Sequence, residues 1–383
     1  MSFSGQSTAE SDKREAKMHW YPFWSPRFWD GMRFGKWLQL VVENRARIDV
    51  RRLPMAALIT LFTPFNSTMA RLQVWRHGRR IRQTAIEYPP LFIIGHWRSG
   101  TTYLHELLAR DPRFTYPTTY QCFAPEHFVV TQWLFAKYFG FLLPRHRPMD
   151  NVQAGWARPQ EDEFALLTMG ARSPYRRMAF PNNGPVDMEY FDMDDLTARE
   201  LDAWKNALRQ FVQAMTYLDP RRTVLKSPTH TGRIHVLSQL FPGAQFIHVT
   251  RHPDSIFPST RRLWTSLDRV QGCQIAHHRD LNEYVFDAFQ RMYHGFHGHR
   301  DELAKDAICD VRYEDLVAAP VASMQRIYEQ LNLGSFASVR ADLVAYTDKQ
   351  KSYQTNRYAI QPELKAEIRT RWAPYFERYG YAD

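Results

Sequence analysis

The chain has 383 residues, of which 44% are hydrophobic and 14% aromatic, so it is long and apolar enough to bury a large core. Its formal net charge of +10 suits an anionic partner such as nucleic acid, anionic lipid or a phosphorylated small molecule. The sequence contains no zinc-finger, RNA-recognition or helix-turn-helix signature, so nucleic acid is not the expected partner.

The N-terminal part differs from the rest of the chain. Residues 1–18 are polar without an apolar core, which predicts a disordered leader rather than a secretory signal. Residues 19–89 are predicted to form a helical arm rich in aromatic and basic side chains, with four tryptophans in His19–Trp37. The apolar stretch Leu53–Phe65 has thirteen residues, too few for the roughly twenty needed to span a bilayer, and the basic segment Arg71–Arg82 follows it. Two interpretations stay open: the aromatic residues pack on the core, or the arm lies in the headgroup region of a membrane.

The segment Pro90–Thr102, PLFIIGHWRSGTT, predicts a strand, a glycine turn and a helix in succession. The apolar run Leu91–Ile94 is the strand candidate, and Tyr103–Arg110 places three leucines on one helical face. A turn of this kind presents unpaired backbone N–H groups of a helix N-terminus to a phosphate. The spacing Gly95-x4-Gly100 matches the Walker A loop, but Thr101 stands where that loop requires lysine. The segment therefore predicts a phosphate site for a ligand other than ATP or GTP.

The following core is predicted to alternate strands and helices, as a right-handed parallel βαβ sheet requires. Further strand candidates are Thr223–Leu225, Phe246–Val249 and Ile308–Val311. The long insertion 111–222 between the first two strands is predicted to be mostly helical. Because ligands of such sheets bind beyond the carboxyl ends of the strands, the residues at those ends are the candidates for a site.

A second phosphate motif follows the third strand candidate. Arg251 stands just after that strand, and Ser259 lies eight residues further on. Together with Arg98-Ser99-Gly100-Thr101-Thr102, about 150 residues earlier, this pair resembles the sulfotransferases that use 3′-phosphoadenosine 5′-phosphosulfate (PAPS). In that family a (K/R)-S-G-T-T loop holds the 5′-phosphosulfate, and the Arg…Ser pair holds the 3′-phosphate. Arginine in the first motif is more similar to the Golgi-type and bacterial branches than to the cytosolic animal enzymes.

The resemblance implies an α/β fold for residues 90–383, a three-layer P-loop-like fold with a central parallel β-sheet flanked by helices. The arm 19–89 would be a helical addition to it. The insertion 111–222 would face the acceptor, and its apolar segment Val129–Pro144 fits either a core helix or a lid over an apolar acceptor.

The resemblance also implies site residues. The cofactor-binding candidates in the two motifs are Arg98, Ser99, Gly100, Thr101, Thr102, Arg251 and Ser259. A basic loop near the C-terminus commonly closes over the nucleotide in this family, and by position and charge Lys351 and Arg357 are the candidates here. Lys226 matches a strand-end lysine that is implied to stabilise the transition state together with Arg98. The alternative interpretation is that Lys226 is an ordinary solvated lysine at a strand end.

Sulfuryl transfer to a hydroxyl or amine is an in-line displacement that needs alignment, charge neutralisation and a base for the acceptor proton. Where the protein-tyrosine branch carries its base, this chain has threonines. The first candidate is therefore Glu161, in the acidic start of an apolar helix that bacterial sulfotransferase-like proteins often share. The alternates are Asp162, Glu163 and His127. Acidic residues in a first helical turn are also ordinary, because the helix dipole stabilises them.

No metal site is expected. The pairs His248/His252 and His277/His278 and the run His294…His297…His299 give no complete ligand set, and transfer from PAPS needs no metal. The cysteines, Cys122, Cys273 and Cys309, are widely spaced and form no Cys-x-x-Cys pair, which predicts a reduced, cytoplasmic protein without disulfides.

The sequence thus predicts a PAPS-dependent sulfotransferase that releases adenosine 3′,5′-bisphosphate. Its acceptor is expected to be a small molecule, lipid or glycolipid, with peripheral contact to the inner membrane surface as one possibility for the arm. Two rivals remain: a P-loop nucleotide kinase or NTPase, and a basic membrane-surface binding module with a vestigial nucleotide site. The oligomeric state is not predicted.

Overall fold

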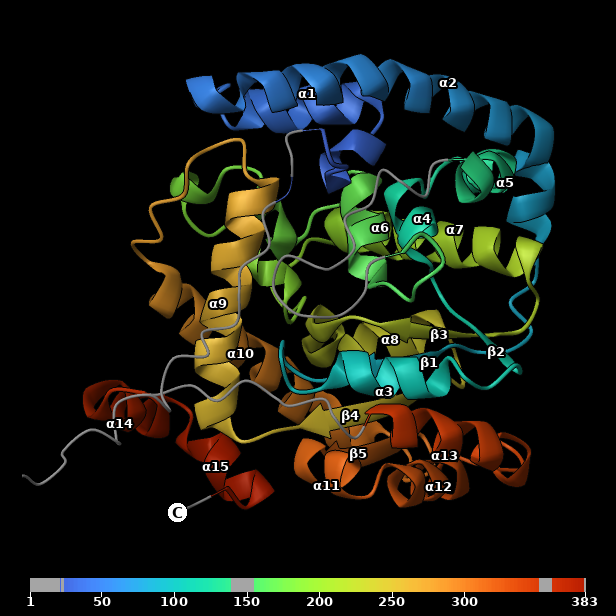
Figure 1. Cartoon of the computed structure of the whole chain (residues 1–383), viewed down its shortest axis with the longest axis vertical. Coiled ribbons are helices and arrows are strands. Elements are labelled where there is room, and N and C mark those ends of the chain that lie inside the picture. Colours follow the sequence, from blue (N-terminus) through green and yellow to red (C-terminus); the bar gives the residue numbers. More distant parts are fainter. Residues whose placement is uncertain (1–20, 22–23, 139–154, 351–359, 382–383) are drawn as a thin grey trace, which may run out of the picture.

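The computed structural model describes residues 21, 24–138, 155–350 and 360–381. A five-stranded, fully parallel sheet with strand order β2-β3-β1-β4-β5 lies at its centre (Figure 1). The strands are β1 Leu91–Ile94, β2 Phe114–Thr115, β3 Arg222–Lys226, β4 Gln245–Thr250 and β5 Ile308–Arg312. The four predicted strands are confirmed. The edge strand β2 was not predicted, because two residues are too short to show a periodic pattern.

Helices cover both faces of the sheet, because side chains alternate along each strand. Leu91 and Ile93 of β1 face a core shared with α3, α12 and α13, whereas Phe92 and Ile94 face a core shared with α7, α8 and α10. These helices are α3 Thr101–Leu108, α7 Ala198–Leu218, α8 Ile234–Leu240, α10 Leu281–His299, α12 Pro320–Gln330 and α13 Ala337–Gln350. The predicted three-layer arrangement is confirmed.

The remaining elements lie in the insertion, after β3 and β4, and toward the C-terminal end of the chain. The insertion contributes α4 Thr119–Phe123, α5 Phe128–Tyr138 and α6 Asp162–Thr168, then the short turns η4 Pro174–Met178, η5 Pro181–Asn183 and η6 Met188–Tyr190. After β3 and β4 come η7 Pro228–Arg233 and α9 Pro253–Gln271, and the chain ends with η8 Arg300–Glu302, α11 Tyr313–Ala318, α14 Pro362–Arg371 and α15 Ala373–Tyr379.

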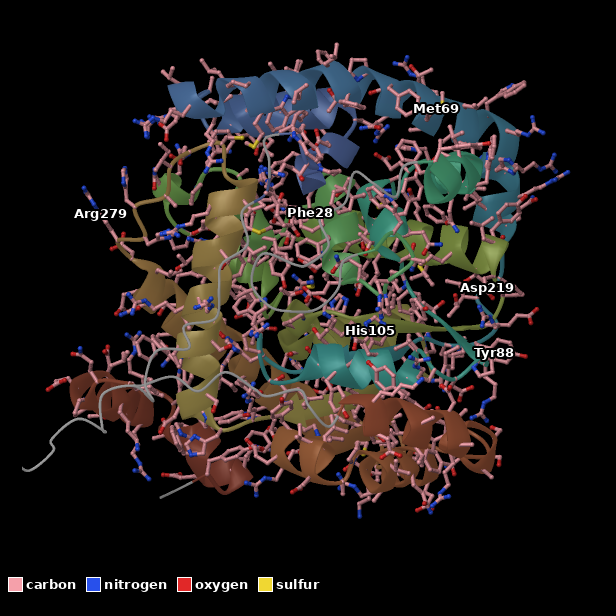
Figure 2. All side chains as sticks on the ribbon, viewed as in Figure 1. Phe28, Met69, Tyr88, His105, Asp219 and Arg279 are labelled. Carbon is pink, nitrogen blue, oxygen red and sulfur yellow. The ribbon has the colours of Figure 1, made fainter. Side chains whose placement is uncertain are left out.

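The N-terminal arm packs on the insertion rather than on the sheet. Its elements are η1 Phe28–Gly31, α1 Phe34–Glu43, η2 Val50–Arg52 and the long α2 Leu53–Gln83. Helices α1 and α2 lie side by side over α5, α6 and α7 (Figure 1). Phe28 is buried beneath them and stacks on Phe164 of α6 with ring centroids 3.9 Å apart (Figure 2). Trp29 and Trp37 are also buried, as the packing interpretation of the arm expects.

Some predictions fall outside the described residues. These are the leader 1–18, the candidates Lys351 and Arg357, and the part of Val129–Pro144 beyond residue 138. Among the helices that the structure does describe, none combines the length and the apolar character needed to cross a membrane.

Candidate active site

The predicted phosphate loop connects β1 to α3 in an unusual backbone conformation. Gly95 and Gly100 have φ of 135° and 108°, and Arg98 between them has φ of 67°. A Cβ atom on Gly95 would lie 2.4 Å from the Val249 carbonyl oxygen, and one on Gly100 would lie 2.2 Å from the Tyr313 ring. Glycine is therefore required at both positions for sterics as well as for backbone geometry. A loop of this kind at a helix N-terminus is a typical anion-binding element.

Ser99 supplies an independent sign of a ligand in this loop. Its side chain is fully buried, and its Oγ atom has no hydrogen-bond partner among the described residues. A buried hydroxyl without a partner is uncommon in native proteins. A phosphate oxygen at the start of α3 would satisfy it, so the loop fits the 5′-phosphate end of PAPS.

The two predicted phosphate motifs meet in space. Arg98 Nε donates to Ser259 Oγ at 2.9 Å, and Arg251 Nη1 donates to the Arg98 carbonyl oxygen at 2.9 Å. The Arg251 guanidinium also lies 4.3 Å from the centroid of the Tyr313 ring. Two guanidinium groups and a hydroxyl thus gather beside the loop. The assignment of Arg251 and Ser259 to a 3′-phosphate remains a prediction.

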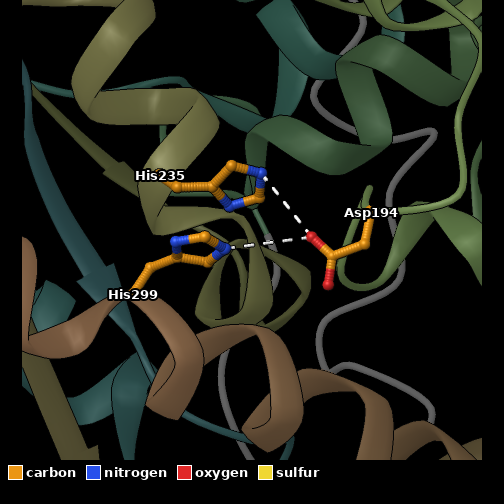
Figure 3. A group of neighbouring side chains, drawn as sticks. All are labelled: Asp194, His235 and His299. Atoms are coloured by element: carbon orange, nitrogen blue, oxygen red, sulfur yellow. Dashed lines mark ion pairs between the residues drawn. The ribbon is translucent and has the colours of Figure 1, made fainter.

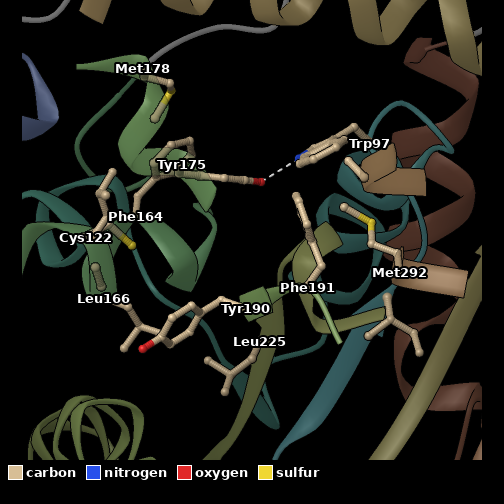
Figure 4. Close-up of a cluster of buried hydrophobic side chains, with 14 of the residues drawn as sticks. Trp97, Cys122, Phe164, Leu166, Tyr175, Met178, Tyr190, Phe191, Leu225 and Met292 are labelled. Carbon is tan, nitrogen blue, oxygen red and sulfur yellow. Dashed lines mark hydrogen bonds between the residues drawn. The ribbon is translucent and has the colours of Figure 1, made fainter. Parts of the chain in front are cut away.

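Lys226 lies beside this loop at the carboxyl end of β3, where the parallel register pairs it with Ile93 of β1. It is buried rather than solvated, with 2% of its side chain exposed, and its Nζ atom donates to Glu161 Oε1 at 2.6 Å. Glu161 Oε2 accepts a second hydrogen bond from the Tyr175 hydroxyl at 2.9 Å. That hydroxyl in turn accepts from Trp97 Nε1 at 2.7 Å (Figure 4). Aromatic side chains therefore hold a charged pair at the carboxyl end of β3.

The structure separates the three consecutive carboxylates. Glu161 is the N-cap residue of α6 and keeps 16% of its side chain exposed, whereas Asp162 and Glu163 are fully buried. Asp162 Oδ2 lies 2.6 Å from Nε2 of His230, and Glu163 Oε2 accepts from Arg233 Nη1 at 2.6 Å. The two buried carboxylates therefore join α6 to η7.

Glu163 also has polar neighbours at both oxygens. Oε1 accepts from Ser173, and Oε2 accepts from Thr229 Oγ1 at 2.9 Å. Burial alone would raise the pKa of Glu163, but the charge and hydrogen bonds of Arg233 outweigh it and hold that pKa below its ordinary value. Glu163 is thus an ion-pair partner of Arg233, which leaves Glu161 as the carboxylate oriented to Lys226.

The alternate base His127 belongs to the junction between α5 and α2. Its Nδ1 atom lies 3.0 Å from Thr131 Oγ1, and its ring makes an edge contact with Phe65 of α2. Burial lowers the pKa of His127 to about 4, so its ring is neutral at pH 7.

Sequence reasoning missed four side chains that shape the site. Tyr313 packs against Gly100 and Arg251, and its only sequence signal is its position just after the strand Ile308–Arg312. Tyr175 and Trp97 orient Glu161, but nothing in the local sequence of either residue indicates that they meet. Thr231 Oγ1 accepts from the Gly95 backbone N–H at 2.8 Å and so ties η7 to the phosphate loop.

A family model described as the sulfotransferase family matches residues 89–337. The omega-hydroxy-beta-dihydromenaquinone-9 sulfotransferases Stf3 of Mycobacterium bovis and Mycobacterium tuberculosis are each 39% identical over 358 residues, covering 94% of this chain and 92% of the relative.

Two solved structures share the fold. The sulfotransferase STF9 from Mycobacterium avium has a TM-score of 0.64 at 16% identity, covering 91% of this chain and 96% of its own. The sulfotransferase STF1 from Mycobacterium tuberculosis H37Rv has a TM-score of 0.60 at 17% identity, covering 91% and 93%.

Proposed function

Because this chain belongs to the sulfotransferase family, we propose that it transfers the sulfuryl group of PAPS to a hydroxyl group of a lipid acceptor. The observation that carries the mechanism is the Lys226–Glu161 pair, located beside a phosphate loop with an unpartnered buried hydroxyl. The kinase alternative is not favoured, because the loop lacks the lysine that holds the β- and γ-phosphates of a nucleoside triphosphate.

The chain offers a separate group for each end of the nucleotide. Ser99 and the backbone of Gly100–Thr102 at the start of α3 would hold the 5′-phosphate, with Arg98 beside them. Arg251 and Ser259 would hold the 3′-phosphate. PAPS, when bound, supplies the sulfuryl group and an adenosine 3′,5′-bisphosphate leaving group. Lys351 and Arg357 remain candidates for a closing loop by position and charge. No metal is needed for this chemistry.

Glu161 is the proposed base for the acceptor hydroxyl. A bond forms between the acceptor oxygen and sulfur, the bond between sulfur and the 5′-phosphate oxygen breaks, and its electron pair leaves with the phosphate. Glu161 takes the acceptor proton, while Lys226 and Arg98 offset the negative charge that grows on the leaving oxygen. Tyr175 holds Glu161 Oε2 and so keeps the carboxylate in one orientation.

For the acceptor we propose the terminal hydroxyl of a prenylated quinol lipid. The support is the Stf3 relatives, whose name specifies an omega-hydroxylated dihydromenaquinone, at 39% identity over nearly the whole chain. Such an acceptor resides in a membrane, so the protein would act in the cytoplasm in peripheral contact with the inner, anionic membrane surface.

The test is a sulfation assay with purified full-length protein and PAPS. Three acceptors are compared: an omega-hydroxylated prenyl quinol in detergent, the same quinol without the terminal hydroxyl, and a soluble alcohol. A product that gains the mass of SO₃ only from the first acceptor supports the proposal. Sulfation of the soluble alcohol alone would refute the lipid acceptor, and no product together with no binding of adenosine 3′,5′-bisphosphate would refute the cofactor assignment.

A further inference from the structure

Helix α2 carries apolar side chains on both of its sides, whereas an ordinary surface helix has its apolar side toward the core. The protein-facing side buries apolar residues together with three polar ones, namely Met55, Ala56, Ile59, Ala70 and Ile81 with Thr63, Asn66 and Gln73. Apolar side chains on its other side are 37% to 81% exposed, namely Leu61, Phe65, Leu72 and Trp75. These four recur at intervals of four, seven and three residues, so they share one side of the helix. We call this side the α2 apolar face.

Specific hydrogen bonds fix the rotation of α2 in this orientation. Asn66 Nδ2 donates to the Met32 carbonyl oxygen at 3.0 Å and to that of Asp30. Gln73 Oε1 accepts from the backbone N–H of Val129 at 2.9 Å, which ties α2 to the first turn of α5. Turning the apolar face inward would leave these buried polar groups without partners, which is costly. The outward orientation is therefore a built feature of the fold.

The charges on α2 are of one sign. The helix carries five arginines and no aspartate or glutamate. Arg76 and Arg79 follow Trp75 on the same side, so the apolar face ends in cations. Trp133 of the neighbouring α5 is also 68% exposed.

We infer that the α2 apolar face binds the surface of an anionic lipid bilayer, with Leu61, Phe65, Leu72 and Trp75 in the interface and Arg76 and Arg79 at the lipid phosphates. Apolar and aromatic residues beside arginines are what a helix needs to lie in the headgroup region. A symmetric contact with a second copy would place two arginine-rich helices without carboxylates against each other, which charge repulsion opposes. The biological purpose of this lipid contact rests on the proposed lipid acceptor, whereas the structural evidence for it does not.

The test is co-sedimentation of the full chain with phosphatidylglycerol vesicles and with phosphatidylcholine vesicles. We expect binding to the anionic vesicles that weakens with salt. The double variant L72E/W75E should lose at least about tenfold in vesicle affinity, because it puts two charges into the apolar interface. The control is V317E, which places a single glutamate at an exposed apolar residue of α11, on the opposite side of the molecule (Figure 1).

Folding and catalysis are measured separately in each variant. Thermal stabilisation by adenosine 3′,5′-bisphosphate and sulfation of a detergent-dispersed acceptor should match the parent chain, so failure of vesicle binding is distinguishable from failure of the proposed reaction. Equal vesicle binding by L72E/W75E and the parent would overturn the inference. So would a concentration-dependent dimer that the double variant abolishes, since that outcome assigns the face to a second copy.

A second group, outside the catalytic residues, points to a metal ion. Asp194 follows η6, His235 lies on α8 and His299 ends α10, and the three side chains converge (Figure 3). Asp194 Oδ1 lies 3.8 Å from His235 Nε2 and 3.9 Å from His299 Nε2, and His294 Nε2 lies 4.0 Å from Oδ2. These distances exceed a hydrogen bond. They approach the spacing of about 3.4 Å between ligand atoms roughly 2.1 Å from a tetrahedral zinc ion.

A hydrogen bond at the other ring nitrogen of His299 also supports a metal site. Nδ1 lies 2.8 Å from Glu302 Oε1, and a carboxylate oxygen only accepts, so Nδ1 carries the hydrogen. The other ring nitrogen, Nε2, faces Asp194 Oδ1 and is the atom that a metal ion between the two side chains would bind. Histidines that bind metals commonly have such a carboxylate partner on the opposite nitrogen.

We propose that Asp194, His235 and His299 bind a divalent transition metal of the zinc type, in a structural role separate from sulfuryl transfer. The test is metal content and thermal stability of the full chain after addition of Zn²⁺ or Co²⁺, with Mg²⁺ as the contrast. We expect one zinc per chain after dialysis, a raised melting temperature, and loss of both in H235A and H299A but not in the control H277A. Equal zinc content in H299A and the parent, or stabilisation by Mg²⁺ as large as by Zn²⁺, would overturn the proposal.

Discussion

The substitution Glu161→Gln isolates the proposed base, because it removes the charge of the carboxylate but keeps its size and one acceptor oxygen. General bases contribute about 10²- to 10⁴-fold to rate, or roughly 3–5 kcal/mol of activation free energy. We therefore expect kcat to fall at least ~100-fold in E161Q. The affinity for adenosine 3′,5′-bisphosphate should hold or rise, since Lys226 and the phosphate-loop residues remain.

The same substitution, E161Q, is expected to lower the free energy of unfolding by a limited amount. Removing one partner of a buried ion pair costs about 3–5 kcal/mol. This is an upper limit for E161Q, because Glu161 is 16% exposed and the amide oxygen still accepts from Lys226. A loss of about 2 kcal/mol in the free energy of unfolding is expected.

The matched control is Glu163→Gln, two residues further along the same helix. It leaves the fully buried Arg233 without its carboxylate, so the free energy of unfolding should fall by about 3–5 kcal/mol. The kcat per folded molecule should nevertheless stay near that of the parent, with the folded fraction counted by bisphosphate binding. The reasoning would be refuted if E161Q kept its kcat within about fivefold, or if E163Q lost kcat per folded molecule to the same extent as E161Q.

Three further predictions concern Arg251, Tyr175 and Asp30 of η1. Arg251→Ala should weaken binding of adenosine 3′,5′-bisphosphate by about 2–3 kcal/mol and leave that of 5′-AMP nearly unchanged, as measured by titration calorimetry; equal losses for both nucleotides would contradict the 3′-phosphate assignment. Tyr175→Phe removes the hydroxyl that joins Trp97 to Glu161, so we expect kcat to fall about tenfold with the KM for PAPS unchanged, and an unaltered kcat would show that Glu161 needs no such support. Burial raises the pKa of Asp30 from 3.8 to about 6, so ionising this carboxyl is harder in the folded than in the unfolded protein. The free energy of unfolding therefore decreases as the pH rises from about 4 to 6, and it stays lower above pH 6. Asp30→Asn should therefore stabilise the protein by up to about 3 kcal/mol at pH 8 and hardly at pH 4 in denaturant unfolding, and an equal gain at both pH values would disprove the linkage.

Local patterns were enough to predict the sheet and the meeting of the two phosphate motifs. Each long strand is a run of apolar residues, and parallel strands place their carboxyl ends at one edge, so Arg98, Lys226 and Arg251 had to converge. The partners of the three carboxylates needed coordinates. From the sequence, Glu161 was the first candidate and Asp162 and Glu163 were alternates, but successive residues at a helix start point about 100° apart, and which of them meets Lys226 is set by tertiary packing.

The orientation of α2 was equally hidden in the sequence. Its apolar residues lie on both sides of the helix, and the sequence alone does not show which side faces the core. The buried Ile59 and the buried hydrogen bonds of Asn66 and Gln73 define the core-facing side. Tyr175 and Trp97 are 78 residues apart, and no local pattern predicts that they bond. Contacts of this kind arise from tertiary packing, which single-sequence patterns do not encode.

Helix α6 connects the two functional ends of the molecule. On one side, Asp162 and Glu163 tie its first turn to His230 and Arg233 of η7, the segment that follows Lys226. On the other side, Phe164 stacks on Phe28 of the N-terminal arm. Glu161 is the N-cap residue of this helix, so the arm packs on the same element that carries the carboxylate paired with Lys226.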